Sequence, residues 1–192
     1  MEIIIVIAIL GFSLKLIANF KINTFLYKEY AQTKLSAQDE TKRILRPMVE
    51  EIRSLSPAST GAFGIEKMTG SEFIFYSDAN NDGLKERIRY TQSGTSLIKG
   101  ITAPSGDPLT YNTANEVVTT IINNVVNGST PMFTYYDSGY TGLAGYASLT
   151  SGRYTDVRLV KIYISVDDDV NQAPPAFTLT TQVSLRNLKN NL

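Results

Sequence analysis

The first fourteen residues form an almost continuous apolar run. From Ile3 to Leu14 every residue is apolar or small, and Glu2 is the one charged residue ahead of this stretch. Twelve helical residues span roughly 18 Å, which is short of the ~30 Å hydrocarbon core of a bilayer. Apolar residues continue past Lys15 to Phe20, and a lysine near the boundary can extend its ammonium group to the lipid headgroups. The pattern therefore predicts a transmembrane helix over residues 1–21.

Two other interpretations of this run are less consistent with the sequence. A cleaved secretory signal carries positive residues before its apolar core and a small-residue cleavage site after it, and the sequence shows neither. A buried core helix would not explain so purely apolar a run at a chain terminus. Glu2 fits either an interfacial acid favoured by the helix N-terminus or an acid that pairs with a cation from another subunit.

An amphipathic pattern with a helical period follows over residues 22–56. Its apolar stripe consists of four residues at spacings of four, four and three: Ile44, Met48, Ile52 and Leu55. Charged residues occupy the opposite face, so the stripe predicts a helix that packs on a sheet. Pro47 removes one backbone donor within it, and we expect a kink near this residue. Serines and Pro57 end the pattern.

From about residue 71 the period of the apolar residues changes to two. Residues 71–77 and 84–92 predict two strands, joined by the turn sequence D-A-N-N-D-G at 78–83. Aliphatic and aromatic residues of the second strand lie on one face and its arginines on the other. The stretch therefore predicts a β-hairpin.

Several further stretches predict strands separated by long polar loops. Val117–Asn124 fits a short helix as well as a strand. The remaining strand candidates are Ser96–Gly100, Val117–Val126, Met132–Tyr136, Val157–Val166 and Phe177–Leu185. One long helix followed by an antiparallel sheet of five to seven strands is an α+β arrangement. We therefore expect three parts: a transmembrane helix over 1–21, an amphipathic helix over 22–56 and a globular β domain over 57–192.

The amino-acid composition excludes several classes of function. Lys and Arg together number 18, as do Asp and Glu, so the net charge is zero and nucleic acid is not indicated as a partner. Cysteine and histidine are both absent. Their absence removes disulfides, Ser-His-Asp and Cys-His catalysis, and the usual zinc ligands. With no phosphate loop or nucleophile elbow either, we expect a protein that is not an enzyme.

The run E-I-I-I-V-I-A-I-L-G resembles the N-terminus of type IV pilins and type II secretion pseudopilins. In that family a glutamate heads an apolar helix that anchors the subunit and packs into the filament core, and Glu2 matches that glutamate. The basic leader and cleavage-site glycine of the family do not precede the run, as if the start were truncated. F-Y-S-D and E-R-I-R-Y in the β domain are loosely similar to minor pseudopilins of the J type and related minor pilins.

The resemblance implies a pilin-like fold, in which the second half of one long helix packs on the sheet. It implies a structural subunit of a type IV pilus-like or type II secretion filament. Before assembly the subunit would cross the cytoplasmic (inner) membrane once, with its globular domain outside, and then enter a periplasmic or extracellular filament. The implied partners are other subunits, the inner-membrane assembly platform, prepilin peptidase and membrane lipid, with Glu2 neutralised by a neighbour's N-terminal amine and the new N-terminus methylated.

The turn at 78–86 carries the clearest local chemistry. Oxygen-bearing side chains at alternate positions, followed by Gly83, match the opening of a calcium loop. Arg89 stands where an EF-hand needs its bidentate glutamate, so only a reduced site remains. Its expected ligands are Asp78, Asn80, Asp82, the carbonyl of Leu84 and Glu86. The alternative for this turn is an ordinary polar hairpin turn without a metal. The alternative function for the protein is a membrane-tethered β domain that binds calcium or another ligand and does not polymerise.

Three weaker motifs have simpler explanations. The run Asp167–Asp169 fits a solvated loop better than a metal site, because adjacent carboxylates point in different directions. Asn127-Gly-Ser matches a glycosylation sequon that is common by chance. Tyr135, Tyr136, Tyr140 and Tyr146 fit packing residues, or a face that binds a partner.

Overall fold

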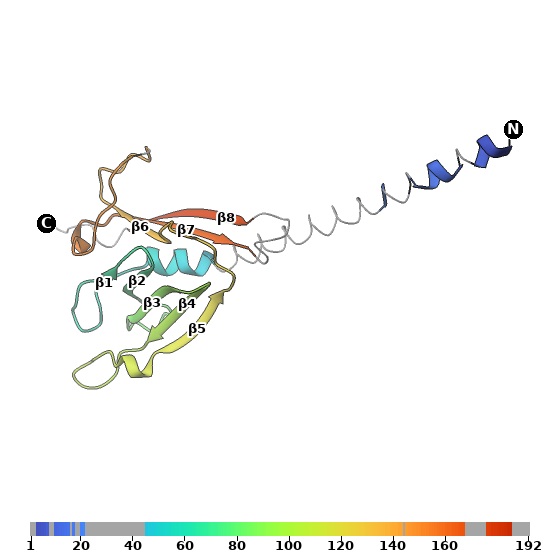
Figure 1. Cartoon of the computed structure of the whole chain (residues 1–192). Helices are drawn as coiled ribbons and strands as arrows, with labels where there is room; N and C mark the ends of the chain where they lie inside the picture. The colour runs from blue at the N-terminus through green and yellow to red at the C-terminus, as the bar shows by residue number, and fades with distance from the viewer. Residues whose placement is uncertain are drawn as a thin grey trace.

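The described part of the chain is built mainly from antiparallel strands. The computed structural model describes residues 3–7, 10–15, 17, 20–21, 45–143, 145–167 and 176–185. A five-stranded sheet has the order β1 (Ile65–Met68), β2 (Glu72–Ser77), β3 (Glu86–Ser93), β4 (Ser96–Thr102) and β5 (Val117–Ile122). A second sheet has the order β6 (Phe133–Tyr136), β7 (Leu159–Val166) and β8 (Phe177–Ser184) (Figure 1).

This architecture corrects the α+β, pilin-like fold expected from the sequence. The described residues form eight strands in two sheets, and their helix is confined to short segments, one of them over residues 45–53. A long helix packed on a single sheet is therefore wrong as a description of this fold. The period of apolar residues shows that a strand has a buried face, but not which sheet it joins. Pro47 lies within the helix at 45–53, and residues 22–44 lie outside the described ranges.

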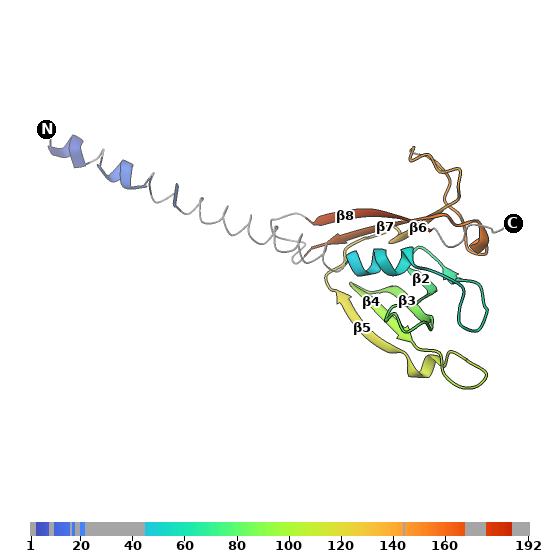
Figure 2. The same cartoon turned by 180° about the vertical axis from the view of Figure 1, so that it is seen from behind.

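The helix at 45–53 lies between the two sheets (Figures 1 and 2). Its buried face belongs to the main hydrophobic cluster and confirms Met48, Ile52 and Leu55 of the predicted stripe. Leu45 joins them, and Ile44 lies outside the described residues. Aromatic rings join the same cluster: the Phe73 ring of β2 lies 5.9 Å from that of Phe133 and 5.3 Å from that of Tyr135, both on β6. Both sheets and the helix thus share one core.

The predicted hairpin is confirmed. β2 and β3 pair antiparallel from Glu72–Thr91 to Ser77–Glu86. Ile88 and Tyr90 are buried in the core. Arg87 and Arg89, which alternate with them, form ion pairs on the opposite face. Residues 117–122 form a strand and not the alternative helix. The four-residue β1 was not predicted, because its burial pattern does not alternate and its pairing with β2 is interrupted by a register shift.

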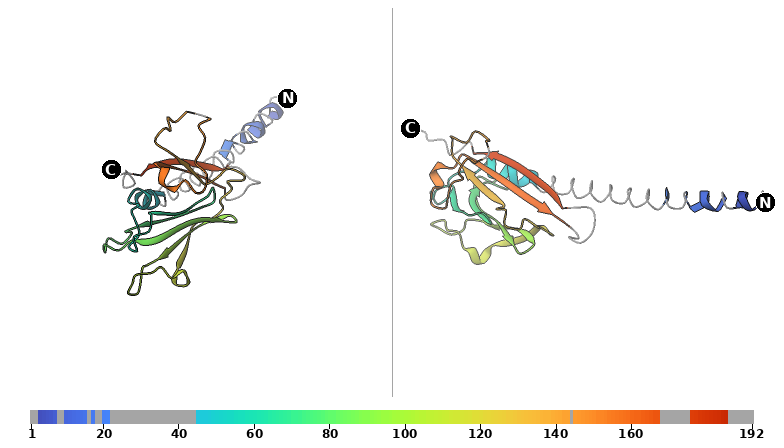
Figure 3. Two further views of the ribbon diagram at one scale, coloured as in Figure 1. Left: turned by 90° about the vertical axis from the view of Figure 1, so that its left-hand side faces the viewer. Right: turned by 45° about the horizontal axis from the view of Figure 1, so that its top comes forward.

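Backbone hydrogen bonds join the two sheets at both ends. Phe133 N donates to Gly70 O in the β1–β2 turn over 3.0 Å, and Val126 N donates to Ser165 O of β7 over 2.8 Å. The Tyr135 hydroxyl also donates to Thr69 O over 3.0 Å. Figure 3 shows the sheets facing one another across the helix. These contacts make the β domain one packed unit.

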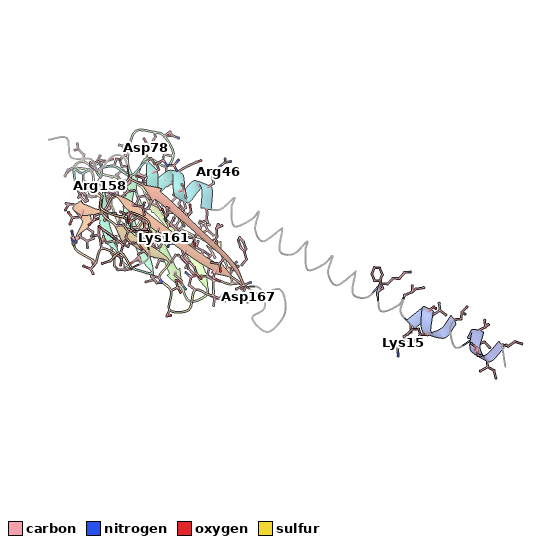
Figure 4. The ribbon with its side chains drawn as sticks, turned by 90° about the horizontal axis from the view of Figure 1, so that it is seen from above. Lys15, Arg46, Asp78, Arg158, Lys161 and Asp167 are labelled. Atoms are coloured by element: carbon pink, nitrogen blue, oxygen red, sulfur yellow. The ribbon has the colours of Figure 1, made fainter. Side chains whose placement is uncertain are left out.

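The described N-terminal segments, at 3–7 and 10–15, lie apart from the sheets (Figure 4). Their large apolar side chains are exposed, from 58% at Ile5 to 76% at Ile3. Among the described residues, no helix combines the length and the apolar character needed to cross a membrane.

Candidate functional site

The β2–β3 turn is tightly curled by its own side chains. Asn81 and Gly83 have positive φ angles, 60° and 93°, a conformation that asparagine and glycine adopt most readily. Asp78 Oδ1 accepts from Asp82 N and Asp78 Oδ2 from Gly83 N, both over 3.1 Å. Asp82 Oδ1 accepts in turn from Leu84 N over 2.8 Å. The acidic side chains therefore face the turn's own backbone donors.

Asn80 completes this set of contacts. Its Oδ1 accepts from Asp82 N over 3.0 Å, and its Nδ2 donates to Asp82 Oδ2 over 2.8 Å. The structure thus brings together three of the predicted calcium ligands, Asp78, Asn80 and Asp82. All three side chains carry oxygen atoms that lie on the turn and remain partly open to solvent.

A lysine holds one side of the turn. Lys85 Nζ lies 3.0 Å from Asp78 Oδ2, and this hydrogen bond keeps the pKa of Asp78 below its ordinary value. The Lys85 backbone is fixed as well, because its N donates to Ser59 Oγ over 2.7 Å and its carbonyl accepts from the Tyr111 hydroxyl over 2.6 Å. The sequence did not reveal this pair, because Lys85 stands at a position with no defined ligand role.

Glu86 lies at the base of the turn, on the first residue of β3. It is only 3% exposed. Its Oε2 accepts from Ala79 N over 2.9 Å, so the carboxylate lies against the turn. Its Oε1 is buried and has no hydrogen-bond partner within the described ranges. A buried carboxylate oxygen without a partner is costly and needs an explanation.

The predicted ligands do not all converge in this conformation. No three acidic side chains of the described residues gather closely enough to hold a metal ion. The Leu84 side chain is 39% exposed at the rim of the turn, and Glu86 lies beneath it. The turn therefore presents one buried acid below and two partly exposed acids above, with the Lys85 ammonium group beside them.

Three of the four noted tyrosines gather beside the loop that follows β6. The Tyr136 and Tyr140 rings stack with centroids 3.9 Å apart, and the Tyr146 ring lies 5.6 Å from that of Tyr140. Tyr135 does not join them, because it lies in the core, where burial raises its pKa well above the ordinary value. A partner-binding face formed by all four tyrosines is therefore wrong.

The charged side chains that line the polar pocket beside these rings already have hydrogen-bond partners. Asp137 Oδ1 accepts from the Tyr146 hydroxyl over 2.7 Å and from Gly139 N over 2.9 Å, which lowers the pKa of Asp137 and raises that of Tyr146. Arg153 Nε donates to Asp156 Oδ2 over 2.7 Å. These contacts hold the loop in place and offer no activated acid or base.

The outer face of the larger sheet carries an ion-pair network. Arg87 of β3 makes two hydrogen bonds to the Glu66 carboxylate, both over 2.7 Å. Arg89 Nε donates to Glu116 Oε1 over 2.9 Å, and this contact raises the pKa of Arg89 and lowers that of Glu116. The sequence predicted the arginine face but not its acidic partners, which come from β1 and from the residue before β5.

The remaining motifs have structural roles or lie outside the described residues. Asn127 is 5% exposed. Its Nδ2 donates to Tyr163 O over 3.0 Å and its Oδ1 accepts from Ser165 N over 2.8 Å, so the folded domain does not present it as a glycosylation acceptor. Asp167 N donates to Asn124 O over 3.0 Å. Asp168, Asp169 and Glu2 lie outside the described ranges.

The N-terminal segments offer the largest exposed apolar surface of the described residues. Ten large side chains between residues 3 and 20 are at least 54% exposed. Contiguous apolar surface of this kind marks a site of contact with a membrane or another protein.

Comparison of the chain with protein-family models and with curated proteins finds no match. The functional argument therefore depends on the residues and their geometry. Two features call for a partner: the apolar N-terminal segments, and the β2–β3 turn with its buried acid.

Proposed function

We propose that this protein is a structural subunit of a type IV pilus-like or type II secretion filament, a minor pilin or pseudopilin. It is anchored in the cytoplasmic membrane before assembly by its N-terminal apolar segment, with the β domain outside that membrane. On assembly the same segment leaves the lipid and packs against those of neighbouring subunits. The other partners are the assembly platform and a prepilin peptidase.

The observation that carries this proposal is the contrast between the two parts of the chain. The β domain buries its apolar residues in one cluster that includes both sheets and the helix at 45–53. The described residues between 3 and 20 expose theirs on every side. Burial of apolar surface contributes about 25 cal/mol per Å². The segment therefore gains most from a lipid or protein environment that the described part of the chain does not itself supply.

The sequence at the head of the segment supports a filament over a simple anchor. A membrane anchor needs only apolar character, whereas an acid at position 2 is costly in lipid unless it is paired. In the proposed filament Glu2 pairs with the N-terminal amine of a neighbouring subunit. That pairing gives the acid a function in assembly that an anchor alone would not require.

Site-specific photo-crosslinking tests the environment of the apolar segment. A photoreactive residue at Ile7 is expected to crosslink to lipid in cells without the assembly machinery, and to other subunits with apolar N-termini when the machinery is present. The same residue at Ser151, on an exposed loop of the β domain, is the control and should not crosslink to lipid in either case. Identical lipid adducts at Ile7 with and without the machinery would contradict the filament and favour a tethered domain.

The charge at position 2 gives a second test. Glu2→Ala should reduce the amount of the protein in sheared filaments while its membrane level and the protease resistance of the β domain stay unchanged. Glu50→Ala is a suitable control, because Glu50 is an exposed acid on the helix at 45–53. Normal assembly of the Glu2→Ala variant would overturn the proposed pairing.

A tethered domain that binds calcium or another ligand without polymerising is the second candidate. The buried acid beneath the β2–β3 turn favours a ligand there, but ligand binding is compatible with either function. The crosslinking pattern of Ile7 separates the two candidates without reference to the turn.

A further inference from the structure

We propose that the β2–β3 turn binds a calcium ion. Binding draws together oxygen ligands from Asp78, Asn80, Asp82, the Leu84 carbonyl and Glu86, which do not all converge in this conformation of the turn, and the ion displaces the ammonium group of Lys85. This inference goes beyond the filament function and does not depend on it. It concerns a hard divalent cation, because every candidate ligand atom in the turn is an oxygen.

The turn already has the curvature that such a site needs. Gly83 and Asn81 take left-handed backbone angles, and this turns the chain sharply after Asp82. Asp78 contacts the backbone of both Asp82 and Gly83, so the first and fifth positions of the loop lie close together. Calcium loops use the same spacing of oxygen ligands, with a glycine at the sixth position. The spacing alone also fits an ordinary hairpin turn.

The buried acid provides an independent observation. Glu86 is 3% exposed and lies against the turn through the bond from Ala79 N to its Oε2. Its Oε1 lacks any partner in the described part of the chain. Buried polar groups are nearly always satisfied by protein, by water or by an ion. The bond from Ala79 N accounts for Oε2 but not for Oε1, and a cation bound at this oxygen would supply the missing partner.

A second orphaned oxygen lies at the same end of the hairpin. Ser56 Oγ is buried without a partner within the described ranges, and Ser56 N donates to Tyr76 O over 3.0 Å. Tyr76 precedes Ser77, which stands directly opposite Glu86 in the β2–β3 ladder. This end of the hairpin therefore has two buried side-chain oxygen atoms, Glu86 Oε1 and Ser56 Oγ, without a hydrogen-bond partner in the described residues.

Lys85 marks the place of the cation. Its ammonium nitrogen lies 3.0 Å from Asp78 Oδ2 and takes up one oxygen of the first candidate ligand. A divalent ion at Asp78 would repel this ammonium group, and Lys85 is long enough to move its charge into solvent. Calcium suits the turn better than magnesium, since calcium accepts irregular arrangements of six to eight oxygen ligands and magnesium requires a nearly ideal octahedron.

Isothermal titration of the full chain in detergent with calcium chloride tests the proposal. A ligand set of this size predicts a dissociation constant of about 10⁻⁴–10⁻³ M, the range of extracellular calcium modules. We expect calcium to release heat and to raise the melting temperature, and magnesium to do so much more weakly. No heat and no shift at about 10 mM calcium, roughly ten times the weaker of those constants, would overturn the site. Magnesium binding as tight as that of calcium would contradict the choice of ion.

Three variants identify the ligands. Glu86→Gln keeps the shape of the side chain and should weaken binding at least about tenfold, a loss typical even for outer partners of a metal. Asp82→Asn should do the same, and because Asp82 is exposed this variant remains informative if Glu86→Gln fails to fold. The opposite result is expected for Lys85→Gln, which should bind calcium about fivefold more tightly. The ion then no longer has to break the Lys85–Asp78 pair, and the attraction of two unit charges about 4 Å apart in water corresponds to a factor of this size.

The matched control is Asp156→Asn, which removes an acid from an ion pair with Arg153 elsewhere on the domain. Its calcium affinity should equal that of the unsubstituted chain. Affinities of Glu86→Gln and Asp82→Asn equal to that of the control would show that calcium binds elsewhere and would overturn the proposal. Unchanged affinity of Lys85→Gln would contradict the displacement of the ammonium group.

Discussion

Gly100 of β4 and Glu116 form a close contact across the outer face of the larger sheet. The Glu116 side chain lies directly over Gly100, and a Cβ atom at position 100 would overlap with its carboxylate. Because Gly100 has no side chain, Glu116 can extend over it to Arg89, the cross-strand neighbour of Gly100 on β3. Glycine in a strand normally weakens it, and here its lack of a side chain makes room for an ion pair.

Gly100→Ala should therefore destabilise the β domain through Glu116. The new methyl group displaces the carboxylate and leaves the partly buried Arg89 without its hydrogen bonds, at a cost of about 1–3 kcal/mol. The free energy of unfolding in urea measures the effect.

The effect of Gly100→Ala on stability should have the opposite sign when Glu116 is replaced by alanine. In a Glu116→Ala background the overlap no longer exists, and alanine in place of glycine should stabilise the strand by about 0.5–1 kcal/mol. A double-mutant cycle between the two positions checks this. Equal effects of Gly100→Ala in both backgrounds would exclude the proposed coupling.

Low pH should lower the stability of the β domain through the Arg89–Glu116 pair. The hydrogen bond from Arg89, followed by the charges of Arg89 and Arg87, keeps the pKa of Glu116 below its ordinary value of 4.5, and burial opposes this only in part. A carboxyl group whose pKa is lower in the folded state stabilises the fold above its unfolded pKa, and this contribution is lost as the pH falls through the folded pKa. The free energy of unfolding should thus decrease below about pH 4.5, and Glu116→Gln should make this decrease shallower. An identical pH profile for the variant would contradict this role.

The helix at 45–53 should be essential to the core. Met48 is 0% exposed and lies in the cluster shared by both sheets. Met48→Ala leaves a cavity there and should cost about 2–5 kcal/mol of unfolding free energy. Val118→Ala on β5 is the control, because Val118 is 53% exposed and its truncation should change stability by less than about 1 kcal/mol. Chemical denaturation of both variants compares them, and a similar small loss in each would show that the helix is not part of the cooperative core.

Asn127 should matter for stability, because its amide bridges two backbone groups of β7. Asn127→Ala leaves the Tyr163 carbonyl and the Ser165 amide without these partners, which should cost about 2–4 kcal/mol for two buried groups. Asn123→Ala, at an exposed position where the side chain accepts from Ser96 Oγ over 3.2 Å, should cost less than about 1 kcal/mol. Thermal melts of both variants test the difference.

The sequence pattern was sufficient to predict those elements whose apolar spacing and turn residues lie close together in the chain. The hairpin of β2 and β3 was predictable because two alternating runs flank a turn of Asp, Asn and Gly. The apolar spacing of Met48 and Ile52 likewise identified the buried face of a helix. β1 was missed because its four residues do not alternate in burial.

The candidate calcium turn was only partly predictable. Two of its ligands, Asp78 and Asp82, lie only four residues apart in the sequence and carry the motif. The burial of Glu86 depends on how β3 packs, and the pairing of Lys85 with Asp78 depends on the path of the turn, so neither follows from spacing alone.

The sequence by itself determined that one end of the chain is purely apolar and headed by an acid, that the hairpin carries an acidic turn, and that much of the rest forms strands. Only the tertiary structure decided that these strands divide into two sheets around a short helix, and that Glu116 passes over Gly100 to reach Arg89. Hydrophobic period is a local property, because it follows from the geometry of one helix or strand. The choice of sheet, the partner of each charge and the burial of each acid depend on contacts between residues far apart in the chain.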